Sequence, residues 1–339
     1  MTDLALLGWT ADRSAELPPD CVPARVSRVD RGRLSVLTGD GEARVHLGSA
    51  LSDETPAVGD WVALRGGLAV AVLPRRSAFV RTMAGRTSAA QVVAANLDVV
   101  LVVDALVGET RLRRVERYLA VAWSSGATPV VVLTKADLCD DVAAAVELVA
   151  EDALGVEVLP VSSVTGQGMD AVRALLGPGR TGAMVGPSGV GKSSLANALA
   201  GRTLAATREI RDDGRGRHTT TARELHVLPD GGLLIDTPGM RELALHDDGG
   251  GVDTAYADIA SLAAGCRFRD CAHRTEPGCA VAAAIDAGRL DPARLTAWRK
   301  LQAEAHRQLL RMDARARAAD SARLRAFSRA LRSQPNRLR

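Results

Sequence analysis

The chain has 339 residues, of which 47% are apolar and 24% charged, and its formal net charge is +3. No apolar run is long enough to cross a bilayer, so we expect a soluble protein with two or three hydrophobic cores and no membrane partner. The net charge is too small to indicate a nucleic-acid partner by itself. Residues 1–10 carry Asp3 and no basic cluster, unlike a secretory signal, so we expect a cytoplasmic protein.

Residues 24–80 form short alternating segments separated by Gly-Asp, Asp-Gly and Gly-Gly turns, a pattern typical of antiparallel strands. The expected strands cover residues 24–29, 33–37, 42–47, 61–64 and 68–73. Five short strands in about fifty residues fit an OB-fold β-barrel, and an SH3-like barrel gives a similar pattern. We predict an OB-fold barrel with an N-terminal extension over residues 1–83.

After residues 81–87, which we interpret as a linker, apolar strands alternate with amphipathic helices. The expected strands cover residues 96–106, 129–133 and 156–161, and the expected helices cover residues 111–124, 142–153 and 169–176. This alternation is typical of a parallel sheet with helices on both faces. We therefore predict an α/β domain over residues 84–248.

Guanine-recognition motifs come early in this α/β domain. Thr134, Lys135 and Asp137 form a TKxD sequence similar to the NKxD motif, in which the carboxylate accepts hydrogen bonds from guanine and so discriminates against adenine. Thr134 stands where Asn is usual, and we expect this to remove the amide that ties the base loop to the phosphate loop. Ser162 and Ser163 lie in a second loop that resembles the SAK motif. A TKxD sequence can also be a helix-entry cap, but its spacing to the second loop favours guanine binding.

A phosphate loop follows these motifs, with the pattern GxxxxGK[ST] between a short strand and a helix. Its residues are Gly186, Pro187, Ser188, Gly189, Val190, Gly191, Lys192 and Ser193, followed by Ser194 in the helix. The glycines allow backbone N–H groups to surround phosphate oxygens at the helix N-terminus. We expect Lys192 to reach the terminal phosphates as a catalytic residue and the Ser193 hydroxyl to bind Mg²⁺.

Two segments after the phosphate loop have the features of switches. Asp236 begins the sequence DTPG at the end of an apolar strand, so we expect it to hold Mg²⁺ through water and Gly239 to donate its N–H to the γ-phosphate. Residues 216–221 read GRHTTT, and we choose the middle threonine, Thr220, to complete the Mg²⁺ shell. The guanine motifs precede the phosphate loop, the reverse of the Ras-like order, which predicts a circularly permuted P-loop GTPase whose DTPG switch leads directly into the C-terminal domain.

The C-terminal domain, residues 249–339, is expected to be α-helical and to bind zinc. Cys266, Cys271, His273 and Cys279 supply three thiolates and one imidazole, which suits a closed tetrahedral metal site better than a disulfide framework. Redox-active thiols are the alternative. With four protein ligands there is no open position for water, so we expect one structural Zn²⁺ per chain.

The end of the chain is strongly basic, because residues 291–339 hold thirteen Lys or Arg against four acidic residues. Either a solvated basic helix or an RNA-contacting helix fits this composition.

The combined pattern resembles the RsgA (YjeQ) family of small-ribosomal-subunit-dependent GTPases. It consists of a barrel, TKAD before GPSGVGKS, then GRHTTT, DTPG and CRFRDCAHRTEPGC, and it covers about residues 20–310. The resemblance implies a monomeric GTPase that acts in late maturation of the 30S subunit and is stimulated by that subunit. It also implies GTP or GDP with Mg²⁺, and 16S rRNA, as partners.

Met240 occupies the position at which Ras-like enzymes carry a water-orienting Gln, so we expect slow unassisted hydrolysis. His218, in the sequence GRHTTT, is our candidate for orienting the attacking water once ribosomal RNA orders that loop. A solvent-exposed loop histidine is the alternative.

Three other functions fit parts of the sequence. An RNA-binding scaffold that binds GTP with negligible turnover is disfavoured by intact Lys192, Ser193 and Asp236. An ATP-using P-loop kinase or nuclease accessory is disfavoured by Asp137, and a zinc-dependent enzyme by the filled ligand set.

Overall fold

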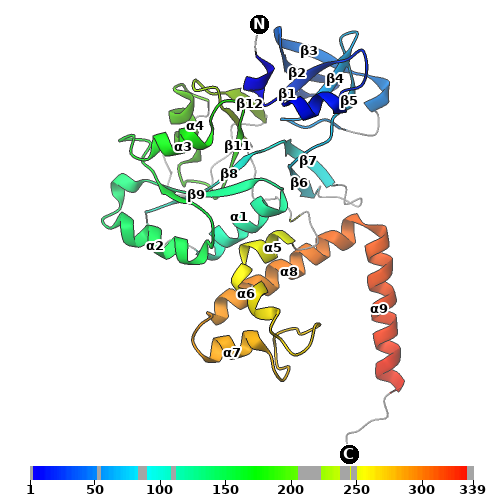
Figure 1. Ribbon diagram of the computed structural model, residues 1–339, viewed down its shortest axis with the longest axis vertical. Coiled ribbons are helices and arrows are strands. Elements are labelled where there is room, and N and C mark those ends of the chain that lie inside the picture. Colours follow the sequence, from blue (N-terminus) through cyan, green and yellow to red (C-terminus); the bar gives the residue numbers. More distant parts are fainter. Residues whose placement is uncertain are drawn as a thin grey trace, which may run out of the picture.

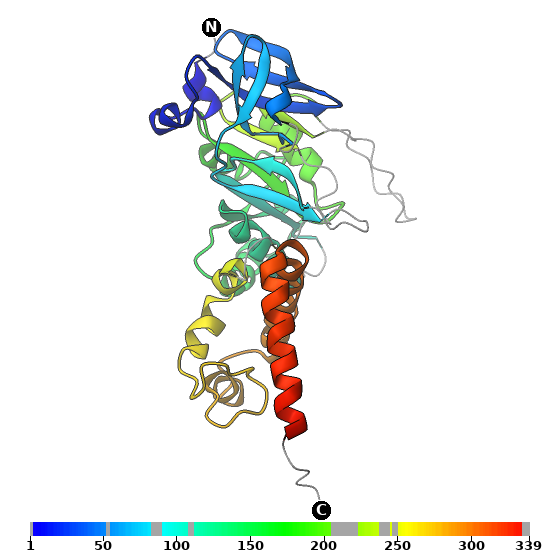
Figure 2. The same ribbon diagram turned by 90° about the vertical axis from the view of Figure 1, so that its right-hand side faces the viewer.

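The computed structural model describes residues 3–51, 55–82, 90–107, 112–204, 223–236, 245 and 250–333. A β-barrel, an α/β sheet and a helical unit follow one another along an elongated molecule (Figure 1). The barrel lies near one end, and helix α9 (Ala314–Ser333) extends to the other (Figure 2). Among these residues, no helix combines the length and apolar character needed to span a membrane.

The barrel contains the five expected strands. They are β1 (Val22–Asp30), β2 (Arg33–Thr38), β3 (Gly41–Leu47), β4 (Trp61–Arg65) and β5 (Leu68–Val72). Their order is β1-β2-β3-β5-β4, and β4 pairs back onto β1 to close the barrel. The parallel pairing of β3 with β5 distinguishes an OB fold from an SH3-like barrel, and so confirms the predicted fold. Alternate strand residues, including Val26, Val36 and Val62, fill the barrel core.

Arg25 on β1 joins the barrel to its neighbours. Its guanidinium is buried and donates to Leu7 O at 2.9 Å, to Asn96 O at 3.0 Å and to Thr181 Oγ1 at 3.0 Å. Leu7 ends the short 3-10 helix η1 (Leu4–Leu7), which precedes a second one, η2 (Ala11–Glu16). One side chain therefore fixes the N-terminal extension, the barrel and the α/β part against one another.

A two-stranded antiparallel ribbon follows the barrel, formed by β6 (Ala78–Thr82) and β7 (Ala90–Ala95). The interpretation of residues 81–87 as a linker was therefore wrong for Arg81 and Thr82. Arg81 pairs with Gln91 in the ladder, and its side chain donates to Gln91 Oε1 at 3.1 Å. The Gly- and Arg-containing stretch that begins at residue 81 indicated a linker, but pairing with β7 extends the strand to Thr82. The remainder of the expected linker, residues 83–89, lies outside the described residues.

The α/β part has the predicted parallel sheet. Its strands are β8 (Val99–Ala105), β9 (Thr128–Thr134), β10 (Val158–Pro160), β11 (Thr181–Val185), β12 (Glu224–Val227) and β13 (Leu233–Asp236). The strand order is β10-β9-β8-β11-β13-β12, and among these strands only β12 is antiparallel to its neighbour. The pairing of Glu224 on β12 with Arg28 on β1 continues the sheet into the barrel.

Helices cover both faces of this sheet. They are α1 (Leu112–Ser124), α2 (Val142–Asp152), α3 (Met169–Leu175) and α4 (Lys192–Ala200). The side chains of β8 alternate: Val100 and Val102 join the core shared with α1 and α2, whereas Leu101 joins the core shared with α3 and α4. This doubly covered strand explains why the sequence of β8 is uniformly apolar rather than alternating.

The C-terminal unit is helical, as predicted. It contains α5 (Gly250–Ala255), α6 (Ala257–Ala263), α7 (Ala280–Asp286), α8 (Pro292–Met312) and α9. Helix α5 packs against α1, and a Cβ on Gly251 would lie 2.3 Å from Ser124 Oγ, so this approach requires glycine. Asp291 caps α8 by accepting a hydrogen bond from Ala293 N at 2.8 Å, with Pro292 in the first turn.

Candidate functional site

The phosphate-loop sequence turns tightly between β11 and α4. Gly186, Gly189 and Gly191 have φ values of 148°, 84° and 97°, which side chains rarely adopt. A Cβ on Gly186 would lie 2.1 Å from Val103 O, so the loop rests directly on the end of β8. Lys192 Nζ donates to Gly186 O at 2.8 Å and to Pro187 O. Backbone N–H groups, a helix N-terminus and an ammonium group thus converge where an anion can bind.

The two loops proposed for guanine lie next to each other at the ends of parallel strands β9 and β10. Val161 N donates to Leu133 O at 2.8 Å, and Ala136 N donates to Val161 O at 3.1 Å. Ser162 is buried, and its hydroxyl accepts from backbone N–H groups of the same loop. Ser163 is half-buried, and Asp137 is exposed, where its carboxylate can accept hydrogen bonds from a ligand.

Thr134 contacts both the end of β8 and the phosphate loop. Its buried hydroxyl lies 3.2 Å from Asp104 O and also contacts Val190 O in the phosphate loop. Lys135 Nζ adds a second link by donating to Gly189 O at 3.1 Å. Thr134 lacks the amide of the usual Asn, but its hydroxyl, together with Lys135, still connects the base loop to the phosphate loop.

Asp236 ends β13, which pairs in parallel with β11, so its carboxylate belongs to the same sheet edge as Lys192 and Ser193. Burial raises the pKa of Asp236, and nearby His226 and Lys192 oppose that rise. A carboxylate and a hydroxyl beside a phosphate loop suit a hard cation such as Mg²⁺. The other residues predicted for this site, His218, Thr220 and Gly239, lie outside the described residues.

Two charged residues beside these loops were not predicted from the sequence. Asp104 is buried at the end of β8, and Arg114 in the first turn of α1 donates to both of its carboxylate oxygens, at 3.0 and 3.1 Å. An acidic residue that ends an otherwise apolar strand was the available signal. Its significance depends on which loops lie beside the strand, and the sequence does not show that.

The four predicted metal ligands come together in the C-terminal unit. Cys266 Sγ and Cys279 Sγ lie 3.5 and 3.6 Å from His273 Nδ1 and 3.9 Å from each other. With Cys271 Sγ, all four ligand atoms lie within 4.8 Å of one another. Tetrahedral coordination with sulfur at about 2.3 Å and nitrogen at about 2.0 Å requires ligand separations of roughly 3.5 to 3.8 Å. The cluster can therefore hold a metal ion.

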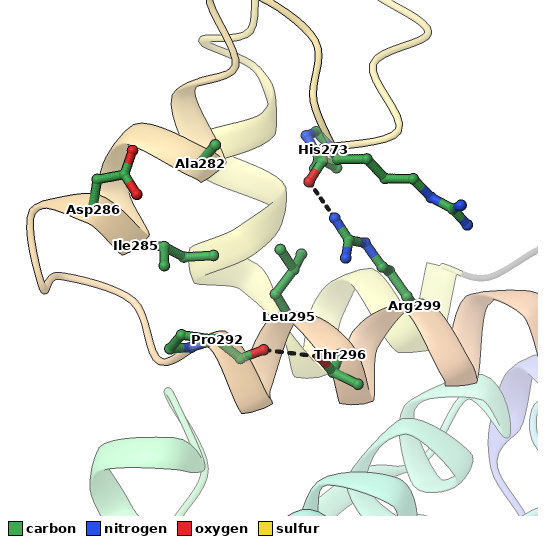
Figure 3. Close-up of a pocket in the computed structure, with 9 residues that line it drawn as sticks. His273, Ala282, Ile285, Asp286, Pro292, Leu295, Thr296 and Arg299 are labelled. Atoms are coloured by element: carbon green, nitrogen blue, oxygen red, sulfur yellow. Dashed lines mark hydrogen bonds between the residues drawn. The ribbon is translucent and has the colours of Figure 1, made fainter.

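The metal-ligand segment, residues 266–279, is fixed to α8. Arg299 donates to His273 O, and the rings of His273 and Trp298 lie 5.6 Å apart. Ile285 and Leu295 line a groove of about 530 Å³ between this segment, α7 and α8 (Figure 3). The groove is remote from the phosphate and guanine loops, so it is a separate feature from the candidate nucleotide site.

One edge of the parallel sheet carries the phosphate loop, the adjacent guanine loops and Asp236 at the end of β13. Together these features define a GTPase-type site, in which the guanine loops come first in the chain. Comparison with known proteins agrees. The model of the RsgA GTPase family matches residues 72–246, and the chain belongs to this family. The chain is 50% identical to the small ribosomal subunit biogenesis GTPase RsgA of Streptomyces coelicolor over 93% of this chain and 90% of that protein. It is 46% identical to the protein of the same name from Xanthomonas axonopodis pv. citri, over 87% and 84%.

Solved structures show the same fold. YjeQ from Thermotoga maritima aligns with a TM-score of 0.64 at 25% identity, over 84% of this chain and 98% of that one. YloQ, described as a circularly permuted GTPase, aligns with a TM-score of 0.61 at 23% identity, over 84% and 95%. The fold of this chain is therefore shared with these proteins over most of its length.

Proposed function

We propose that this chain is a GTP hydrolase that acts in late maturation of the small ribosomal subunit, slow alone and stimulated by that subunit. The name of the relatives that it matches over most of its length supports this role. The observation that carries the GTPase assignment is the convergence of the phosphate loop with the guanine loops through Thr134 and Lys135.

In this proposal Asp137 and Lys135 recognise guanine, and Ser162 and Ser163 shape the loop that meets its O6. Residues 186–194 surround the phosphates, and Lys192 neutralises the terminal ones. Ser193 and Asp236, with Thr220, hold the Mg²⁺ that accompanies GTP and supplies charge stabilisation at the phosphates. Gly239 contacts the γ-phosphate, and His218 orients the attacking water.

The cluster of Cys266, Cys271, His273 and Cys279 holds one structural Zn²⁺ in this proposal. Three thiolates and an imidazole are a ligand set that zinc favours, and the separations among Cys266, His273 and Cys279 are close to those of its tetrahedral geometry. The ion stabilises a segment that has little hydrophobic core of its own.

The partners proposed are GTP or GDP, the 30S subunit and its 16S rRNA, bound by a cytoplasmic monomer. The Arg-rich helix α9 supports an RNA partner, because its most extensive contacts with another helix or strand are those with α8, and five of its arginines are exposed. Its exposed arginines include Arg315, Arg323 and Arg325.

Steady-state GTP hydrolysis by the purified chain, with and without small ribosomal subunits, tests the proposal. We expect slow turnover alone, on the order of 10⁻⁴ to 10⁻² s⁻¹, and a large stimulation by small subunits only. Large subunits and the Lys192→Ala variant are the controls. Tight GTP binding with no turnover under any condition would favour a GTP-binding RNA scaffold instead.

A further inference from the structure

The end of strand β8 lies between the two nucleotide loops. Val103 O packs against Gly186 so closely that no Cβ fits there, and Asp104 O accepts from the Thr134 hydroxyl. Leu106 N also donates to Thr134 O at 2.9 Å. Any displacement of this strand end would therefore move the phosphate loop and the base loop together.

Arg114 fixes this strand end to helix α1. Its guanidinium donates to both oxygens of Asp104, which is buried, and Asp104 Oδ1 also accepts from Ala105 N at 2.9 Å. Hydrogen bonds between two ionised groups are stronger and more directional than neutral ones. The β8 and β9 ladder holds the backbone of Asp104, and the first turn of α1 holds its carboxylate.

The same turns of α1 hold the C-terminal unit. Arg117 forms a two-point ion pair with Glu304 on α8, at 2.5 and 2.8 Å. Glu116, which is buried, accepts from Arg294 of α8 at 2.6 Å and from the Tyr256 hydroxyl at 2.9 Å. Arg113 contacts Asp291, which caps α8. Of these pairs, Glu116 and Arg294 are buried, so removing either side chain would leave the other charge unpaired away from water.

We propose that Asp104 and Arg114 are positioning residues for guanine-nucleotide binding, and that α1 makes their position depend on how the C-terminal unit is docked. The inference rests on the nucleotide site proposed above. It adds a route between that site and the C-terminal unit which does not pass through the DTPG segment. The coupling must be reciprocal: docking of the C-terminal unit changes nucleotide affinity, and bound nucleotide changes that docking by the same free energy.

Dissociation constants for fluorescent GDP and a non-hydrolysable GTP analogue test this inference in the full-length chain. We expect Arg114→Gln to raise both constants roughly 5- to 20-fold, because the phosphate loop and the base loop would lose a common support. Arg114→Lys should restore part of the affinity, because a lysine can still pair with Asp104.

The remote arm of the test is Arg117→Gln, which removes the ion pair with Glu304. We expect it to raise the same constants about 2- to 10-fold. In the double variant, the changes in binding free energy caused by Arg117→Gln and Arg114→Gln should not add, because both act through α1. The matched control is Arg173→Gln on α3. The side chain of Arg173 is 37% exposed, close to the 31% of Arg114 and the 34% of Arg117. The control should bind nucleotide like the wild type.

Unfolding temperatures by circular dichroism separate lost affinity from lost folding. If Arg114→Gln does not fold, Arg114→Lys and Arg117→Gln decide the outcome. Unchanged affinity in folded Arg114 variants, or strictly additive effects of the two sites, would overturn the inference while leaving the nucleotide site intact. A wild-type chain that binds no guanine nucleotide would refute the proposed function as well.

Discussion

At the scale of single residues, the surroundings of Asp236 in the nucleotide site disfavour the ionised form of its carboxyl group. Burial raises the pKa of Asp236 above its ordinary value of 3.8, and Lys192 only partly offsets this. In the nucleotide-free protein, ionised Asp236 therefore destabilises the fold once the pH exceeds the pKa of Asp236 in the folded state. Below its pKa in the unfolded state the group is neutral in both states, so the folding stability is unaffected. Bound Mg²⁺ would remove this penalty by pairing with the carboxylate.

We predict that Asp236→Asn stabilises the nucleotide-free protein at neutral pH and abolishes Mg²⁺-dependent GTP binding. The gain should shrink as the pH falls through the folded pKa of Asp236, because the wild-type group is then protonated. Urea unfolding at several pH values measures the stability, and calorimetry with Mg²⁺ and GTP measures binding. A variant less stable than wild type at pH 7 would show that Asp236 has a structural role that we have not identified. Asp230→Asn, in an exposed turn, is the control.

At the scale of elements, the metal-ligand segment depends on contacts that α8 supplies. His273 has a left-handed backbone, with φ of 58°, and its carbonyl accepts from Arg299. Glu276 accepts from three nearby backbone N–H groups, those of Ala272, Arg274 and Thr275. Local hydrogen bonds therefore shape the loop, but few apolar side chains hold it, which is why a bound ion should matter to its stability.

We predict that the purified chain contains one zinc ion and that removing it unfolds residues 266–279 locally. Elemental analysis gives the metal content, and limited proteolysis after chelation should cut within this segment while leaving the α1 and α8 contact intact. Cys271→Ser should lose the metal, and Cys21→Ser, away from the cluster, should keep it. Stoichiometric metal in Cys271→Ser would contradict the four-ligand site.

At the scale of the whole molecule, the barrel and helix α9 lie toward opposite ends of an elongated body (Figure 2). Arg25 locks the barrel onto the α/β part, whereas α9 leaves α8 near Asp313 and projects away from the rest of the chain. The sequence of α9 contains six arginines and one aspartate. A cationic helix held away from the body can contact RNA phosphates without disturbing the nucleotide site.

We predict that ending the chain after Met312, where α8 ends, weakens binding to small ribosomal subunits and makes it less dependent on salt. Each lost phosphate contact should lower the slope of log affinity against log salt by about 0.7 to 0.9. A full-length variant with Arg323, Arg325 and Arg329 changed to Gln should reproduce most of the effect, and GTP hydrolysis without ribosomes should not change. An unchanged slope in both variants would exclude α9 from the RNA interface.

The sequence by itself determined much of this protein, because the informative features are local. The phosphate loop, the TKAD motif, the four metal ligands and the five barrel strands each depend on residue types at short spacings, and the structure brings each set together. The order of these motifs also predicted the permuted topology. The β6 and β7 ribbon was missed although both strands are largely apolar, because a two-stranded ribbon is defined by the pairing of its strands, which neither sequence shows.

Only the tertiary structure decided how the parts are connected. Arg117 and Glu304 are separated by 187 positions, and Thr134 and Val190 by 56, so no periodicity in the sequence relates them. In the sequence, Arg113, Glu116 and Arg117 are indistinguishable from the solvated charges of any amphipathic helix. Packing of α8 against α1 places Arg117 opposite Glu304 and buries Glu116 against Arg294. These pairings across two distant helices, rather than any local pattern, connect the C-terminal unit to α1 and the nucleotide loops.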